Sequence, residues 1–199
     1  MTRRPPFGDD EDVDLDDLHG DWDWQRPRGI FVLVPIDGDA GAQIRQIRAQ
    51  HDPKLAAMNA PHITLIGSSG AGPIAADTPR ERLAQVFDEI AASTPPFEVT
   101  AEPPHRFVDT GIVSFPLPAR GPLRALHERI LTSGLRFLPT RFAFAPHATI
   151  SYYPDVSREK ERALLALKLT APIRIERLEL SLTNDPQPPD ILLSLALGG

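Results

Sequence analysis

Two short stretches decide the fold predicted for this chain of 199 residues: Pro-His-Ile-Thr-Leu at residues 61–65 and Pro-His-Ala-Thr-Ile at residues 146–150. Side chains on a β-strand alternate between the two faces, so the His and Thr of each stretch share one face and the aliphatic residues share the other. Each stretch is therefore predicted to be a strand that anchors one face in a core and presents an imidazole and a hydroxyl on the opposite face.

The segments that precede the two stretches repeat as well. An apolar run at residues 29–35 and a predicted helix at residues 40–51 lead to the first stretch. A predicted strand at residues 111–117 and a predicted helix at residues 122–134 lead to the second. Two copies of one strand–helix–strand unit predict two lobes related by pseudo-symmetry, with a site between them.

Further helices and strands are predicted from capping residues and periodicity. Thr78 is expected to cap a helix, because proline follows it and Glu81 stands three residues later. That helix carries an apolar stripe made of Leu83, Val86, Phe87 and Ile90. The remaining elements are expected at residues 97–103 (strand), 157–168 (helix), 172–183 (strand) and 190–197 (strand). The strand at 172–183 changes parity between Ile175 and Leu178, which predicts a bulge or bend there.

The charge of the chain is distributed unevenly. The formal net charge is −6, but residues 1–25 alone hold nine acidic and two basic residues. The remaining 174 residues carry 19 Lys and Arg against 18 Asp and Glu. We therefore expect residues 1–28 to form an acidic, flexible tail and residues 29–199 to form a single bilobal domain. A near-neutral domain lacks the broad basic field of a protein that binds long duplexes.

The composition also excludes several classes of protein. The chain has no cysteine, which excludes a disulfide scaffold, a thiolate nucleophile and a Cys-ligated metal site. The N-terminal residues are not followed by the apolar segment of a signal peptide, and the longest apolar runs are too short to span a bilayer. We expect a cytoplasmic monomer with no membrane partner, no metal and no cofactor.

The paired histidines indicate a particular chemistry. If the two lobes face each other, His62 and His147 converge with Thr64 and Thr149. Imidazole titrates near neutrality, so one ring can act as a general base while the other acts as a general acid. Hydroxyl groups can donate to the negative charge that develops on a phosphate. This set suits in-line substitution at phosphorus. A zinc site would need a third ligand, and no HExxH spacing is present.

The residues His62-Ile63-Thr64-Leu65 and His147-Ala148-Thr149-Ile150 resemble the paired His-x-Thr motifs of the two-histidine (2H) phosphoesterase superfamily. Within it the chain is most similar to the 2′-5′ RNA ligase group, whose members act as RNA 2′,3′-cyclic phosphodiesterases. The resemblance implies an α+β, bilobal fold with two pseudo-symmetric lobes and mainly antiparallel sheets around a central cleft. It also implies that His62 and His147 are catalytic, that Thr64 and Thr149 bind phosphate, and that the substrate is an RNA end or a cyclic nucleotide.

Two alternatives to cyclic phosphate hydrolysis stay open. The same four residues could run the reverse reaction and join RNA ends through a 2′-5′ linkage. The chain could also be a non-catalytic module that binds RNA or a nucleotide. Neither alternative is decided by the sequence.

Several other residues are weaker candidates. Arg141 and Tyr153 share strand parity with His147, so they are candidates for contacts with the substrate. Phe142 and Phe144 have the opposite parity and are expected in the core. His105 is expected in a loop, and His51 and His127, on helices, are given no catalytic role.

Overall fold

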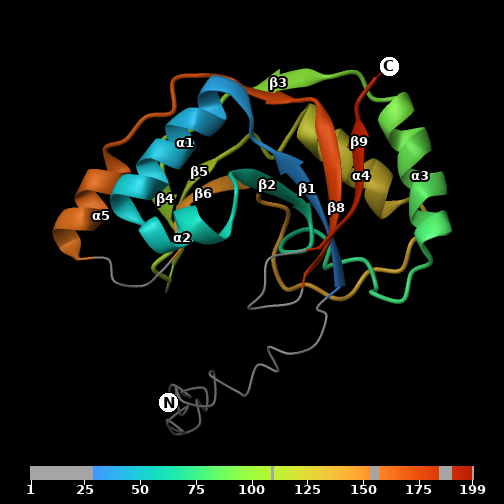
Figure 1. Cartoon of the computed structure of the whole chain (residues 1–199). Coiled ribbons are helices and arrows are strands. Elements are labelled where there is room, and N and C mark those ends of the chain that lie inside the picture. The colour runs from blue at the N-terminus through green and yellow to red at the C-terminus, as the bar shows by residue number, and fades with distance from the viewer. Residues whose placement is uncertain (1–28, 109, 153–156, 184–189, 199) are drawn as a thin grey trace, which may run out of the picture.

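The computed structural model describes residues 29–108, 110–152, 157–183 and 190–198 (Figure 1). The described helices are α1 (Gly38–His51), α2 (Pro53–Met58), α3 (Arg80–Ala92), α4 (Pro122–Leu131) and α5 (Arg158–Leu165). The described strands are β1 (Gly29–Pro35), β2 (His62–Ile66), β3 (Phe97–Val99), β4 (His105–Arg106), β5 (Val113–Pro116), β6 (His147–Ser151), β7 (Ile173–Ile175), β8 (Arg177–Thr183) and β9 (Asp190–Ala196). The predicted tail at residues 1–28 lies outside the described residues, so its flexibility stays a prediction.

The architecture is α+β, as predicted. One seven-stranded sheet has the order β4-β5-β6-β2-β1-β8-β9, and a second sheet pairs β3 with β7. All registered strand pairs among the described residues are antiparallel. The two motif strands, β2 and β6, are neighbours near the middle of the large sheet. Figure 1 shows α1, α2 and α5 on one side of the molecule and α3 and α4 on the other.

The predicted pseudo-symmetry is visible in the strand registers. In the first unit, Pro35 of β1 pairs with His62 of β2, and the register shifts between Val32 and Leu33. In the second unit, Pro116 of β5 pairs with His147 of β6, and the register shifts between Val113 and Ser114. Each motif strand therefore has the same partner geometry, down to an irregularity at an equivalent position.

The helices of the two units are exchanged between the halves of the sheet. Helix α1, which follows β1, packs against β6, whereas α4, which follows β5, packs against β2. Each helix places two buried aliphatic residues and one buried polar residue at the same spacing: Ile44, Ile47 and Arg48 in α1, and Leu123, Leu126 and His127 in α4. Arg48 and His127 both bond to backbone carbonyls of the motif strand against which their helix packs. The two units thus interlock, and neither is a separate domain.

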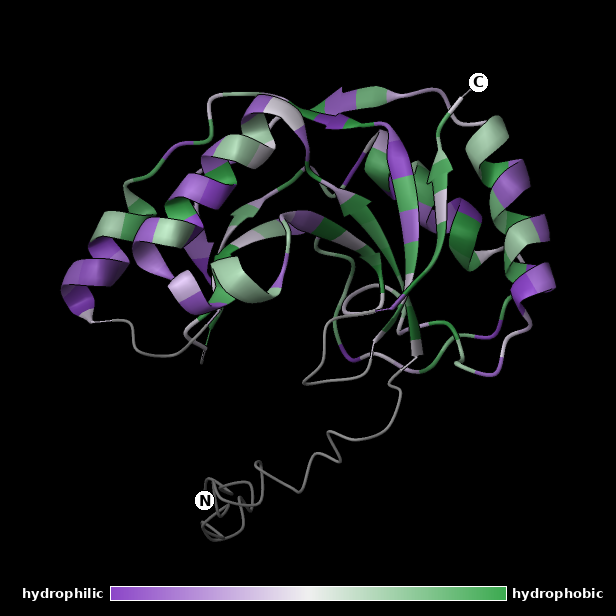
Figure 2. Cartoon of the chain, viewed as in Figure 1, coloured by the Kyte–Doolittle hydropathy of each residue, from purple (hydrophilic) through white to green (hydrophobic). Residues whose placement is uncertain are grey.

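The core follows the amphipathic pattern of the elements. Figure 2 shows β1 as hydrophobic over most of its length, whereas α3 carries hydrophobic and hydrophilic residues on different sides. The apolar stripe expected on α3 is buried, as are the inward residues Ile63 and Ala148 of the motif strands. In the part of the chain that the structure describes, no helix is both long and apolar enough to cross a bilayer.

Some local predictions need correction. Thr78 does not cap α3: its hydroxyl donates to the carbonyl of Ala75 at 2.7 Å within a turn, and the helix begins after Pro79. The strand expected at 97–103 ends at Val99. Phe142, expected in the core, is 69% exposed, because it lies in the irregular segment before β6, where strand alternation does not apply. Phe144 is buried as expected.

The irregularity predicted between Ile175 and Leu178 is confirmed. The stretch at 172–183 divides into β7, which pairs with β3, and β8, which pairs with β1 and β9. The change of parity therefore marks the point where the chain passes from the small sheet to the large one.

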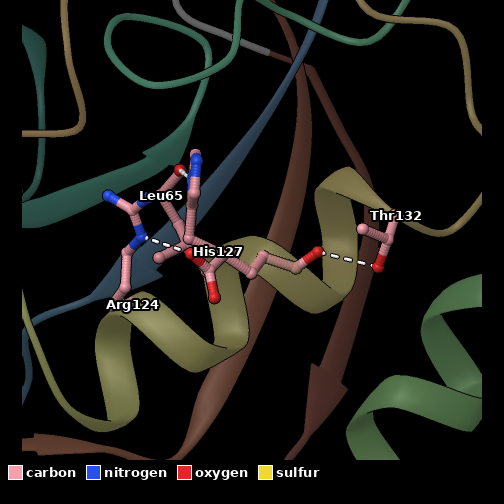
Figure 3. A network of polar contacts seen from close by, with 5 residues as sticks. Leu65, Arg124, His127 and Thr132 are labelled. Carbon is pink, nitrogen blue, oxygen red and sulfur yellow. Dashed lines mark hydrogen bonds and ion pairs between the residues drawn. The ribbon is translucent and has the colours of Figure 1, made fainter.

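His127 of α4 lies next to Leu65 of the first motif strand, β2 (Figure 3). It is 2% exposed, its Nδ1 donates to the carbonyl of Leu65 at 2.9 Å, and its ring stacks on Phe144. A Cβ added to Gly70 would lie 2.6 Å from its Nε2, so the ring is tightly enclosed. Burial lowers the pKa of His127 below its ordinary value, partly offset by the Leu65 carbonyl; Arg124 lowers it further.

We predict that the stability of the protein depends on the volume of the side chains buried where β2 pairs with β6. Ile63 is 0% exposed and pairs with Ala148. Ile63→Ala should lower the free energy of unfolding by about 2–5 kcal/mol, because it removes buried methyl groups and leaves a cavity. Ile191→Ala is the matched control: Ile191 is 60% exposed and the loss should stay below about 0.5 kcal/mol. Equal losses for both variants in urea unfolding would contradict the prediction.

We predict that acidification destabilises the protein partly through His127. Its pKa is lower in the folded state than the ordinary 6.5, so the unfolded chain binds more protons and stability falls as pH drops through this range. His127→Asn keeps a side-chain donor for the Leu65 carbonyl but does not titrate. Urea unfolding at pH 7.5 and pH 5 should therefore show a smaller loss of stability on acidification for the variant than for the wild type. An equal loss would count against the prediction.

Candidate active site

The four motif side chains lie on one face of the central strand pair. Ile63 of β2 pairs with Ala148 of β6, and both are fully buried. Continuing this antiparallel register by one residue in each direction places His62 opposite Thr149 and Thr64 opposite His147. All four are partly exposed, unlike their inward neighbours. The structure therefore brings the two predicted motifs together, with each histidine facing the threonine of the other motif.

The two imidazole rings are held in the same way. Nδ1 of His62 lies 2.8 Å from the carbonyl oxygen of Ala60, and Nδ1 of His147 lies 2.8 Å from that of Ala145. A carbonyl oxygen only accepts hydrogen bonds, so Nδ1 carries the proton in each neutral ring. This leaves Nε2 of each ring with a lone pair when the ring is neutral, and with a proton to give when it is charged.

The surroundings lower the pKa of both rings. For His62 the main cause is burial; the Ala60 carbonyl raises the pKa in part, and the charges of Arg48 and His147 lower it. For His147 burial is again the main cause, the Ala145 carbonyl opposes it, and His105 lowers the pKa. Both rings therefore favour the neutral form more than a free imidazole does.

The neighbours of the two histidines differ in spite of the pseudo-symmetry. The guanidinium of Arg48 acts on His62, whereas His147 is bordered by an aromatic pair. The Phe107 and His147 rings meet edge-on with centroids 4.9 Å apart, and His105 contacts Phe107 in the same manner at 4.8 Å. His105 was expected in a loop but is the first residue of β4, at the edge of the sheet.

Ser114 extends the row of polar groups on this face. It pairs with Thr149 on one side and with His105 on the other. Its hydroxyl is buried and has no hydrogen-bond partner within the described residues. Nothing in the sequence distinguished Ser114, because a serine in an otherwise apolar strand is common.

Neither of the two weaker candidates makes a side-chain contact with the motifs within the described residues. Arg141 is exposed in the segment before β6, so the parity argument does not fix its direction. This segment is tied to the turn after β2, since Gly70 N donates to the Phe142 carbonyl at 2.8 Å. Tyr153 lies outside the described residues. Both stay predictions.

No metal centre is indicated by the side chains. Over residues 29–108, 110–152, 157–183 and 190–198, no group of three or more His, Cys, Asp or Glu is placed to hold an ion. A hollow on the molecule is lined by residues of α3, of α4 and of the turn after α4, among them Arg82, Glu89, Arg129 and Ser133. It contains neither motif, and its lining carries charges of both signs, so we assign it no part in the chemistry of the histidines.

Comparisons with known proteins agree with this geometry. The structure of Escherichia coli LigT complexed with ATP is similar, with a TM-score of 0.57 at 15% identity, covering 87% of this chain and 99% of that one. LigT complexed with phosphate gives 0.53 at 17% identity, with 87% and 99% covered. A crystal structure described as a phosphoesterase gives 0.54 at 16% identity, with 87% and 100% covered. At these identities the likeness shows the fold.

A search of curated protein sequences finds no match. A family model, in contrast, matches residues 36–186, a span that includes both motifs and most of the sheet. The resemblance to the two-histidine phosphoesterases that the paired motifs suggested is thereby confirmed. The chain belongs to the 2′-5′ RNA ligase superfamily.

Proposed function

We propose that this protein is a phosphodiesterase that opens 2′,3′-cyclic phosphates at RNA ends or on related nucleotides, without a metal ion. Residues 29–199 would form the catalytic domain. The observation that carries the proposal is the matched pair of rings: both Nδ1 atoms are bonded to carbonyls at 2.8 Å. The register of Ile63 with Ala148, extended by one residue each way, sets each histidine opposite a threonine of the other motif. Within the described residues only Nδ1 of each ring is hydrogen-bonded, so two Nε2 atoms on one face can take and give a proton across one phosphate.

The reaction follows from this arrangement. One neutral histidine takes a proton from water at its Nε2, and the water oxygen forms a bond to phosphorus. The bond from phosphorus to one ribose oxygen breaks, and that oxygen receives the proton on Nε2 of the other, charged histidine. Thr64 and Thr149 donate their hydroxyls to the non-bridging oxygens, where negative charge increases in the transition state. The product is a 2′- or 3′-phosphomonoester.

The different neighbours of the rings favour one division of roles. Besides burial, the charged guanidinium of Arg48 lowers the pKa of His62, whereas the pKa of His147 is lowered by burial and by His105. An anionic phosphate between the rings favours protonation of both. The proton then resides on His147, the ring without a fixed cation beside it. We therefore assign the base to His62 and the acid to His147.

Family membership and the structural relatives support chemistry of this type. The superfamily match supports a phosphodiesterase-type enzyme in general. LigT has been crystallised with phosphate, with ATP and with 3′-AMP, so a protein of this fold binds phosphate and nucleotides. Nucleotide phosphates are accordingly the class of substrate to test first.

We predict that both histidines are required for hydrolysis of 2′,3′-cyclic nucleotides in excess EDTA. His62→Ala and His147→Ala should each lower kcat by about 10²–10⁴-fold, because each removes one proton transfer. His51→Ala, a histidine outside both motifs, is the matched control and should retain activity. Chromatography of the product identifies the 2′- or 3′-phosphate, and circular dichroism checks the fold of each variant.

The outcomes of that assay separate the alternatives. Turnover that does not depend on either histidine would refute the proposed site. If none of the four cyclic nucleotides is hydrolysed, an RNA with a 2′,3′-cyclic end is tested alone and then with a 5′-hydroxyl RNA. Joining of the two RNAs would identify a ligase, and binding without any reaction would identify a non-catalytic module.

We predict that the hydroxyls of Thr64 and Thr149 stabilise the transition state. Thr64→Val and Thr149→Val keep the branched shape but remove the donor, so each should lower kcat by about 10²-fold. Thr64→Ser and Thr149→Ser restore the hydroxyl and are the matched variants, expected to retain most of the activity. Valine variants as active as the wild type would show that the threonines serve only the packing of the strands.

A further inference from the structure

A buried arginine lies between the two motifs and neither takes nor gives a proton in the proposed reaction. Arg48 of α1 is 1% exposed, although arginine is almost never fully buried without partners. Its Nε and Nη2 donate to the carbonyl of Thr149 at 2.9 and 2.6 Å, and its Nη1 donates to the carbonyl of Asn59 at 2.9 Å. One planar group thus holds the second motif and the segment that enters the first.

The position of Arg48 in its helix favours an apolar residue. It follows Ile44 and Ile47 on the buried side of α1, where a leucine would fill the space without desolvating a charge. Burial lowers the pKa of Arg48 to about 10, with Asp52 acting in the opposite direction, so the side chain stays charged at neutral pH. This buried charge donates hydrogen bonds to a carbonyl of the second motif and to one in the segment before the first motif, which points to a role in the site.

We propose that Arg48 is a positioning residue that fixes the two catalytic motifs relative to each other by holding the carbonyls of Thr149 and Asn59 on one guanidinium. The inference rests on the proposed function of the motifs. It assigns a task to a side chain that touches neither substrate nor reacting atoms.

Asp52 completes the same connection. Its carboxylate accepts from the backbone N–H of Leu55, where it caps α2, and from the backbone N–H of Tyr152 at 2.8 Å. The hydroxyl of Ser151 also contacts it, at 3.3 Å. Helix α1 and the start of α2 therefore hold β6 at Thr149 and again just beyond it, which fixes the strand that carries His147.

The charge of Arg48 reaches the first motif as well. The charged groups that act on His62 are Arg48 from α1 and His147 from β6, while Nδ1 of His62 is occupied by the Ala60 carbonyl. The cation therefore helps to keep His62 neutral, as a base must be. Removing it should raise the pKa of His62 and shift the acidic limb of the kcat/KM profile to higher pH.

The test compares Arg48→Met, Arg48→Lys and Arg45→Met. Arg45→Met is the matched control, because Arg45 lies on the same helix but is exposed. Two properties are measured for each folded variant: kcat and KM for a 2′,3′-cyclic nucleotide, and the pKa of the His62 ring from its NMR signals, assigned by their absence in His62→Ala. Thermal unfolding shows whether each variant is folded.

We expect Arg48→Met to lower kcat by about 100-fold, as a small misplacement of catalytic groups does, and to raise the pKa of His62. Arg48→Lys keeps the charge, so the pKa of His62 should stay low. Its single ammonium cannot donate to the Thr149 and Asn59 carbonyls with the geometry of the planar guanidinium, so kcat should still be reduced. Arg45→Met should match the wild type. If Arg48→Met does not fold, Arg48→Lys alone tests the positioning, through its reduced kcat.

A merely structural role gives a different result. Folded variants of Arg48 that melt at a lower temperature, but keep the wild-type kcat and the wild-type pKa of His62, would overturn the inference. If the wild type hydrolyses no cyclic nucleotide, the proposed function fails, and the NMR signals of the His62 and His147 rings in folded Arg48→Met and Arg48→Lys still test the positioning. Signals of both rings shifted in both variants would support it, and signals at their wild-type positions would overturn it.

Discussion

The antiparallel contact of β2 with β6 is the constraint on which the rest of the structure depends. The registered pair Ile63 and Ala148 is completely buried, so both motif strands must turn the same face to the core. Because side chains alternate along a strand, the face opposite the core must then carry His62, Thr64, His147 and Thr149. A slip of one residue at this pair would bury the imidazoles and expose the aliphatic residues. The free energy of packing therefore selects the register in which the histidines and threonines of both motifs share one face.

The exchange of helices explains why the pair is held firmly. A strand pair with one registered contact is a weak connection by itself, but α1 of the first unit covers β6 of the second, and α4 of the second covers β2 of the first. Arg48 and His127 add bonds from these helices to backbone carbonyls of the strands. The two halves cannot separate without exposing both helix interfaces, so the site between them is part of one core.

Sequence reasoning succeeded where the signal lies within one segment. The repeated motif predicted the strands and their faces, and the change of parity after Ile175 predicted the passage between sheets. It failed where a residue is governed by distant neighbours. Thr78 bonds to Ala75 and does not cap the helix, and Phe142 lies outside the strand whose parity was applied to it. Arg48 looked like any exposed helical arginine, although its position four residues after Ile44 on the apolar side was a usable signal.

Pseudo-symmetry gives two like histidines, but hydrolysis needs two unlike ones. A base and an acid must differ in protonation at the moment of reaction, and equal surroundings would give them equal affinity for a proton. The structure breaks the equality at the equivalent helix position, where α1 carries Arg48 and α4 carries His127. Besides burial, Arg48 lowers the pKa of His62 and His105 lowers the pKa of His147, so the two rings have different neighbours while the strands keep the same register. In the proposed mechanism, the fold would thus supply the geometry twice, and the different neighbours of the two rings would distinguish their roles.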